Sequence, residues 1–133
     1  MKNLVIDLDG TLTVESKKPY SEKSINLEVV EKLRQYKKMG FRITIFTSRN
    51  MRTYQGNIGL INMHTLPEII QWLDKHDVPC DEVIVGKPWC GFDGFYVDDK
   101  AIRPSEFIDK SYDEIKSLLA NETNYHKEDV VIK

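Results

Sequence analysis

The sequence has few cysteines, no surplus of basic residues and no long apolar run, and each absence excludes a class of protein. Only two of its 133 residues are cysteine, Cys80 and Cys90, too few for a disulfide-rich scaffold or a zinc cluster. Its 19 basic and 21 acidic residues give a net charge of −2, so we expect neither nucleic acid nor an anionic membrane as a partner. Its apolar runs are far too short to span a bilayer.

What remains is the composition of one globular domain. Hydrophobic residues make up 41% and charged residues 30%, which indicates a folded chain rather than a disordered one. The length leaves no room for a second domain, so we predict a single domain over residues 1–120 and a C-terminal tail over 121–133. The chain begins without a signal-peptide pattern, and with so few cysteines this predicts a cytoplasmic protein.

Short apolar runs alternate with helical patterns along the chain. We predict strands at 2–6, 42–46, 82–85 and 94–97, and helices from Asn26 to Gly40, over 66–75 and over 111–120. Residues 12–25 should form a polar flap and residues 51–64 an irregular excursion, while 130–132 suit an edge strand, a dimer contact or a frayed end. This alternation predicts an α/β fold with a three-layer, Rossmann-like, doubly wound and mostly parallel sheet.

Polar side chains follow every predicted strand. Asp7 and Asp9 come after the first strand, two residues apart, so their side chains leave on the same side. The polar residues after the other three strands are Thr47, Lys87, Asp98 and Asp99. Because ligands bind at the carboxyl ends of the strands in such sheets, we expect all of these residues in one crevice. So many carboxylates together are unfavourable without a divalent cation, and oxygen ligands of this kind favour Mg²⁺.

The same residues carry a resemblance to the haloacid dehalogenase-like superfamily of phosphohydrolases. Its four motifs match Asp7-Leu8-Asp9-Gly10-Thr11, Thr47, Lys87 and Asp98-Asp99. The longer stretches 47–53, 86–91 and 94–99, continuing through 101–107, are similar to the small phosphatases found with capsule-polysaccharide biosynthesis genes. The resemblance implies a Mg²⁺-dependent phosphatase that acts on a small phosphorylated metabolite, such as a sugar phosphate or a related polysaccharide precursor.

The resemblance also implies a role for each motif residue. Asp7 would attack the phosphoryl group and form an aspartyl-phosphate. Asp9 would protonate the leaving oxygen and then activate the water that hydrolyses the intermediate. Thr47 would donate a hydrogen bond to a phosphoryl oxygen, and Lys87 would offset charge in the transition state.

The implied metal site combines the first and the last motif. Mg²⁺ would bind the carboxylate of Asp7, the backbone carbonyl of Asp9 and one of the two neighbours Asp98 and Asp99. Which of those two is the direct ligand stays open at this stage.

The gaps between the motifs are too short for a cap domain. Residues 12–46 and 48–86 hold the predicted elements and leave too little chain for an independent domain, so we expect a capless protein with an open crevice. Substrate contacts should then come from the rim, where arginine suits a second phosphate or carboxylate and tryptophan a sugar or base. The candidates are Gly10, Ser48, Arg49, Asn50, Arg52 and Trp89.

Alternatives to this function differ in substrate or in class. An open crevice also admits a nucleotide or a macromolecular phosphate. A non-catalytic binding subunit is a further alternative, although such a module has no need of the complete polar set. The missing cap and the apolar end of the tail leave a homodimer or tetramer open.

Overall fold

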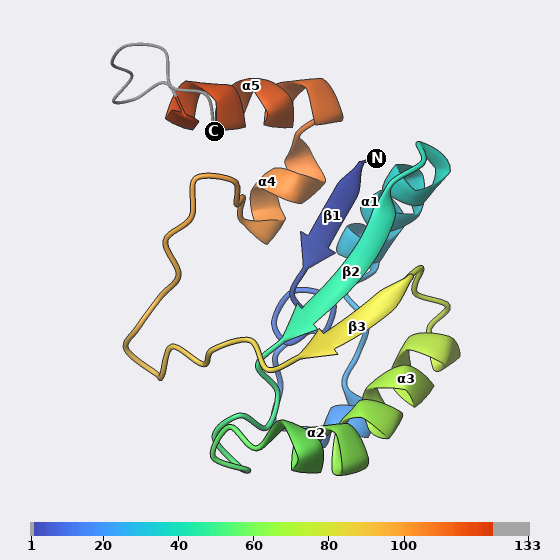
Figure 1. Cartoon of the computed structure of the whole chain (residues 1–133). Helices are drawn as coiled ribbons and strands as arrows, with labels where there is room; N and C mark the ends of the chain where they lie inside the picture. Colours follow the sequence, from blue (N-terminus) through green and yellow to red (C-terminus); the bar gives the residue numbers. More distant parts are fainter. Residues whose placement is uncertain (1, 124–133) are drawn as a thin grey trace.

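A computed structural model describes residues 2–123 of the chain, and three parallel strands form its centre (Figure 1). The strands are β1 (Asn3–Ile6), β2 (Arg42–Thr47) and β3 (Glu82–Val85), in the order β1-β2-β3. Val5 pairs with Thr44 of β2, and Phe46 of β2 pairs with Ile84 of β3. The α/β class and the parallel, Rossmann-like sheet predicted from the sequence are confirmed.

Helices connect the strands and follow the last one. They are the 3-10 helix η1 (Tyr20–Glu22), α1 (Leu27–Lys38), α2 (Ile58–His64), α3 (Leu66–Lys75), α4 (Pro104–Asp109) and α5 (Tyr112–Thr123). The apolar residues of α1 recur at helical spacing, and this spacing places Val30, Leu33 and Tyr36 on its buried face. No helix within residues 2–123 is long and apolar enough to cross a membrane.

The core lies on one face of the sheet. Both crossovers run in the same direction, and right-handed connections therefore place α1 and α3 on the same side. Ile43 and Ile45 of β2 point to that side and are fully buried, together with Leu33 of α1 and Ile69 of α3. On the opposite face, Val5 is 63% exposed, so the second helical layer of a doubly wound sheet does not cover β1.

The predicted fourth strand is absent from the structure. Residues 94–97 belong to a long loop that leaves the end of β3, extends away from the sheet and returns at α4 (Figure 1). The prediction rested on aromatic and β-branched residues, which favour a strand because of what they pack against in a sheet. Phe95 and Val97 have no such neighbour and are 79% and 88% exposed.

Two helices were missed by the sequence prediction. The second half of the excursion 51–64 is α2, whose N-cap residue Asn57 accepts a hydrogen bond from the backbone N–H of Leu60. At α4 the side chain of Glu106 accepts from the N–H of Arg103, and Pro104 opens the helix. Both helices are too short for a clear apolar period.

The strand or dimer contact considered for 130–132 lies outside the described residues.

Candidate active site

A tight turn after β1 carries the first two predicted site residues, Asp7 and Asp9. Three successive backbone N–H groups after Gly10 donate to the carbonyl of Leu8, at 2.9 to 3.2 Å. Gly10 has φ +78°, a conformation that favours glycine, and its N–H donates to the hydroxyl of Thr13. Leu8 between the two aspartates is fully buried, which anchors the turn and holds both carboxylates at the end of the sheet.

Asp7 lies between a cation and a hydroxyl. The Nζ of Lys87 is 3.5 Å from Oδ1, and the hydroxyl of Thr11 donates to Oδ2 at 3.2 Å. Burial raises the pKa of Asp7, and this outweighs the opposite effects of Lys87 and of the hydrogen bonds from Leu8 and Thr11. One third of the Asp7 side chain remains exposed, so a ligand can reach the carboxylate.

Asp9 is held by Arg49 through both carboxylate oxygens. Nε of Arg49 is 3.0 Å from Oδ2, and Nη2 is 2.8 Å from Oδ1. The guanidinium also lies 4.1 Å from the ring centroid of Tyr20, whose own pKa is raised by burial and by the charge of Asp9. Arg49 is only 3% exposed, so the structure places it beneath the surface rather than at the predicted rim.

Tyr20 reaches Arg49 because residues 12–25 form an ordered flap. An antiparallel bridge between Thr13 and Ile25 closes the base of the flap, and the N–H of Val14 donates to the carbonyl of Ser24. The sequence predicted the flap but not this contact, since nothing in the local pattern pairs Tyr20 with a residue after β2. The Nη1 of Arg49 is buried and has no hydrogen-bond partner within residues 2–123.

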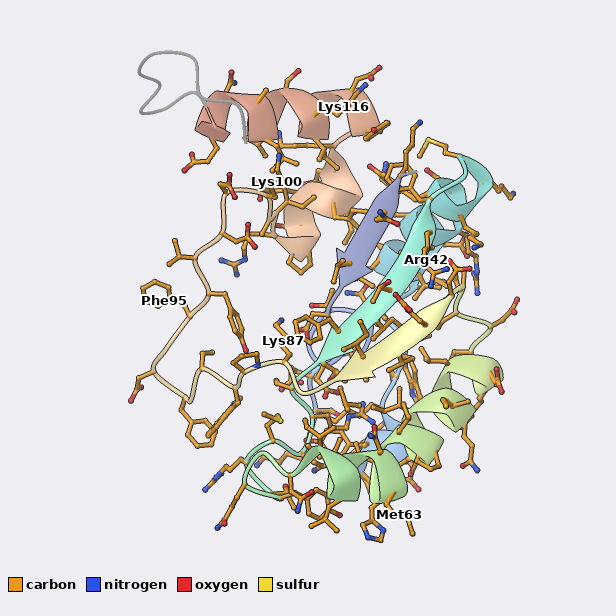
Figure 2. The ribbon with its side chains drawn as sticks, viewed as in Figure 1. Arg42, Met63, Lys87, Phe95, Lys100 and Lys116 are labelled. Atoms are coloured by element: carbon orange, nitrogen blue, oxygen red, sulfur yellow. The ribbon has the colours of Figure 1, made fainter. Side chains whose placement is uncertain are left out.

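Thr47 and Lys87 complete the group at the ends of β2 and β3. The backbone N–H of Lys87 donates to the carbonyl of Thr47, and the hydroxyl oxygen of Thr47 accepts from the N–H of Arg49. The Thr47 hydroxyl proton therefore remains for another acceptor. Figure 2 shows Lys87 where the strands end. A continuous set of contacts thus joins five predicted site residues, running from Asp7 through Lys87 and Thr47 to Arg49 and Asp9.

Asp98 and Asp99 do not join this group, and the expected convergence of all four aspartates is wrong for this arrangement. Both lie exposed in the loop after β3, and Asp98 accepts a hydrogen bond from the N–H of Lys100. Within the described part of the chain, no three acidic, histidine or cysteine side chains gather closely enough to hold a metal ion. The fourth strand that should have positioned the pair is not formed, so this arrangement leaves Asp98 and Asp99 apart from Asp7 and Asp9 and holds only part of the expected Mg²⁺ ligand set.

The remaining predicted substrate contacts are engaged with protein neighbours. Asn50 has φ +61°, and its Oδ1 accepts from the hydroxyl of Thr65 at 2.7 Å, which ties this loop to the start of α3. The guanidinium of Arg52 lies 5.8 Å from the ring centroid of Trp89 and 5.1 Å from that of Phe92. The backbone carbonyl of Ser48 accepts a hydrogen bond from the N–H of Met51. Roles of these residues in substrate binding stay predictions.

Comparisons with known proteins find a family model and a solved structure that are similar to this chain. A family model described as haloacid dehalogenase-like hydrolase matches residues 4–69. The crystal structure of an MCSG target from Vibrio cholerae is similar, with 57% identity and a TM-score of 0.90 over 92% of this chain and 99% of that one. Residues 4–69 of the chain are thus similar to the haloacid dehalogenase-like hydrolases.

More distant matches add nothing to that assignment. One chain of a Pnkp1/Rnl/Hen1 RNA repair complex has 19% identity and a TM-score of 0.48, over 68% of this chain and 27% of that one. Another Pnkp1/Rnl/Hen1 complex gives 21% and 0.49, over 83% and 35%. No curated protein matches the chain.

Proposed function

We propose that the chain is a phosphatase that hydrolyses a phosphate monoester through a phosphorylated Asp7. The observation that carries this proposal is the setting of Asp7, with Lys87 at one carboxylate oxygen, Thr11 at the other and one third of the side chain open to a ligand. A carboxylate nucleophile splits one difficult displacement into two easier ones. The match of residues 4–69 to the family model of haloacid dehalogenase-like hydrolases supports the same chemistry.

Lys87 and Thr47 serve the phosphoryl group. Because the Nζ of Lys87 lies 3.5 Å from Asp7, its charge also acts on a phosphoryl group that is being transferred to that carboxylate. The hydroxyl of Thr47 already accepts from the N–H of Arg49, so its proton is free for a phosphoryl oxygen. Both groups are fixed before substrate binds, which lowers the cost of arranging them during the reaction.

Asp9 acts as general acid and then as general base while Arg49 holds it. Each carboxylate oxygen has two lone pairs, so an oxygen that accepts one N–H from Arg49 can still take up a proton. The first step needs that proton on the leaving oxygen, and the second returns one from the attacking water. A quarter of the Asp9 side chain is exposed, so water can reach it.

Mg²⁺ is the cofactor in this proposal, and it would neutralise charge on the phosphoryl oxygens. Asp98 or Asp99 would have to approach Asp7 to complete its ligand set, which they do not do in the described arrangement. The steps above therefore use only the side chains of the chain itself.

The proposed substrate is a small phosphorylated metabolite, such as a sugar phosphate or a related precursor in capsule or polysaccharide biosynthesis. The resemblance of the motif-flanking stretches supports this choice. The connections between the site strands hold the flap, α1, α2 and α3 and no cap domain, so the substrate is not enclosed by a separate lid domain.

Hydrolysis of p-nitrophenyl phosphate, with and without Mg²⁺, tests the chemistry. We expect Mg²⁺-dependent release of phosphate by the wild type and none above background by Asp7→Asn. Asp74→Asn is the matched control, because Asp74 is an exposed aspartate of α3 away from the site. No hydrolysis by the wild type, or full activity of Asp7→Asn, would contradict the proposal. A panel of sugar phosphates, nucleotides and phosphopeptides, ranked by kcat/KM, then tests the substrate class.

A further inference from the structure

The flap, residues 12–25, is fixed to the rest of the fold at both of its ends. At its start, the hydroxyl oxygen of Thr13 accepts a hydrogen bond from the N–H of Gly10 at 3.1 Å, which connects the flap to the turn after β1. Near its end, the Nε1–H of Trp72 on α3 donates to the carbonyl of Lys23 at 2.9 Å. The side chains of Thr13 and Trp72 are buried, so both connections are shielded from water. The flap is therefore held between the turn after β1 and α3.

The middle of the flap is held by a buried lysine. The Nζ of Lys23 donates to the carbonyl of Ser16 at 3.3 Å and lies 3.6 Å from Oε1 of Glu15. A lysine is almost never buried unless its charge has partners, and here these partners belong to the flap itself. The contacts close the loop from position 15 to position 23, so the helix η1 within it has a fixed place against α3.

η1 places Tyr20 beside the pair formed by Asp9 and Arg49. The ring centroid of Tyr20 lies 4.1 Å from the guanidinium carbon of Arg49 and 5.3 Å from the Nζ of Lys23. The nearer of the two cations is thus the one that binds Asp9. Burial and the charge of Asp9 raise the pKa of Tyr20, whereas the charge of Arg49 lowers it, as expected for a ring next to both members of the pair.

The hydrogen bonds to Asp9 hold only one edge of the Arg49 guanidinium. Nε and Nη2 donate to the carboxylate, whereas Nη1 is buried and has no hydrogen-bond partner within residues 2–123. Bonds along a single edge act as a hinge, so they leave the group free to tilt out of the plane of the carboxylate. The guanidinium lies over the ring of Tyr20, which attracts the cation and blocks tilting on that side.

We propose that Tyr20 is a positioning residue for the acid–base chemistry of Asp9 and that it acts through Arg49. The ring restrains the guanidinium, the guanidinium aligns the carboxylate, and the fixed ends of the flap hold the ring in place. The link to Asp9 rests on the proposed function, whereas the restraint of Arg49 by the ring does not. The ring alone is needed for this role, so Tyr20→Phe should behave as the wild type does.

Hydrogen exchange at Nε of Arg49 tests the restraint without any activity measurement. ¹H–¹⁵N spectra of the arginine side chains should contain a slowly exchanging Nε–H signal that Arg49→Lys lacks. Tyr20→Leu should lose this slow exchange, and Tyr20→Phe should keep it. Tyr20→Gln, which also lacks the ring and suits a position that is 36% exposed, should match Tyr20→Leu. Slow exchange that persists in both ringless variants would overturn the restraint.

Tyr54→Leu is the matched control for the loss of a tyrosine ring. The ring neighbour of Tyr54 is His64, at 5.9 Å between centroids, and Tyr54 belongs to the loop before α2. This variant should keep the slow exchange at Arg49 and the rates of the wild type. Circular dichroism spectra that match the wild type show that each variant is folded.

The dependence of the rate on the leaving group tests the link to Asp9. Phenyl phosphate has a poorer leaving group than p-nitrophenyl phosphate and depends more on a proton from Asp9. In the first turnover of phenyl phosphate with Mg²⁺, Tyr20→Leu should release phenol about 5- to 30-fold more slowly than the wild type, the range expected for one lost cation–π contact. The loss should be smaller with p-nitrophenyl phosphate. Equal losses with both esters would overturn the link, since general damage to the site slows both.

A double variant tests whether Tyr20 acts through Arg49. Tyr20→Leu/Arg49→Lys should be no slower than Arg49→Lys alone, because the bidentate contact that the ring restrains is already lost. Losses that multiply would show that Tyr20 acts independently of Arg49 and would overturn the proposal. A wild type that hydrolyses neither ester would overturn the proposed function and the link to Asp9. Slow exchange that still requires the ring would then leave the restraint of Arg49 supported.

Discussion

The guanidinium of Arg49 binds the carboxylate of Asp9 through two hydrogen bonds, from Nε to Oδ2 at 3.0 Å and from Nη2 to Oδ1 at 2.8 Å. This pair joins the turn after β1 to the loop after β2, and the ring of Tyr20 in the flap covers it. Arg49 therefore acts on the proposed acid–base residue, and its burial keeps it from the rim where the sequence had placed it.

Arg49→Lys should lower kcat and leave KM nearly unchanged. A lysine cannot bind both carboxylate oxygens of Asp9 in this bidentate geometry. Asp9 therefore loses its fixed orientation, although the positive charge at position 49 is kept. Hydrogen bonds to charged groups contribute about 1.5–3 kcal/mol, which corresponds to a loss of about 10- to 150-fold in kcat. Steady-state kinetics on p-nitrophenyl phosphate measure both constants. Arg34→Lys is the control, since Arg34 pairs with Glu31 on α1. A raised KM with an unchanged kcat would instead assign Arg49 to substrate binding.

Lys87→Met should lower kcat by about 10²- to 10³-fold, the range found when a single charge-stabilising group is removed. Methionine retains most of the length of the side chain against the ring of Tyr96 and removes only the ammonium group near Asp7. Single-turnover kinetics should show the loss in the phosphoryl-transfer step. Lys75→Met, at the end of α3, should keep wild-type rates. An unchanged rate for Lys87→Met would remove Lys87 from the site.

The sequence predicted the elements whose signals are local. The strand at 82–85 and the helix at 66–75 match β3 and α3, because their apolar patterns and the proline in the first turn of α3 lie within each segment. The prediction of a strand at 94–97 was wrong because its formation depends on contacts outside the segment. Its aromatic and β-branched residues are locally indistinguishable from those of a paired strand, and only the tertiary fold decides whether a partner edge is within reach.

In the candidate site, the sequence predicted the contacts that follow from the order of the strands and missed those that depend on loop conformation. Asp7 and Lys87 meet as the positions of β1 and β3 in a parallel sheet require, with Thr47 between them at the end of β2. The pairing of Asp9 with Arg49 spans 40 positions and depends on a loop conformation after β2, which no local pattern encodes.

Asp81→Asn should destabilise the fold at neutral pH and have little effect in acid. The N–H of Ile43 and the ammonium of Lys37 lower the pKa of Asp81 below its usual 3.8. The ionised form is therefore favoured in the folded state, and its stabilisation is complete above pH 3.8 and is lost as the pH falls through the lower folded value.

Thermal unfolding across this range measures the effect. Tm of the variant should lie below that of the wild type at neutral pH, and the two should converge below pH 3.8. Asp74→Asn, on the exposed side of α3, should follow the wild type throughout. A difference for Asp81→Asn that stays constant with pH would contradict the ionic origin of the effect.

Chemical trapping of phosphorylated Asp7 tests the proposed mechanism most directly. Wild-type protein turning over a ³²P-labelled phosphate monoester is quenched in acid, treated with borohydride, and digested. Borohydride reduces an aspartyl-phosphate to homoserine. We predict acid-stable label on the quenched wild type, homoserine at position 7 after reduction, and neither in Asp7→Asn. Turnover without label, or homoserine at any other aspartate, would contradict a nucleophilic Asp7.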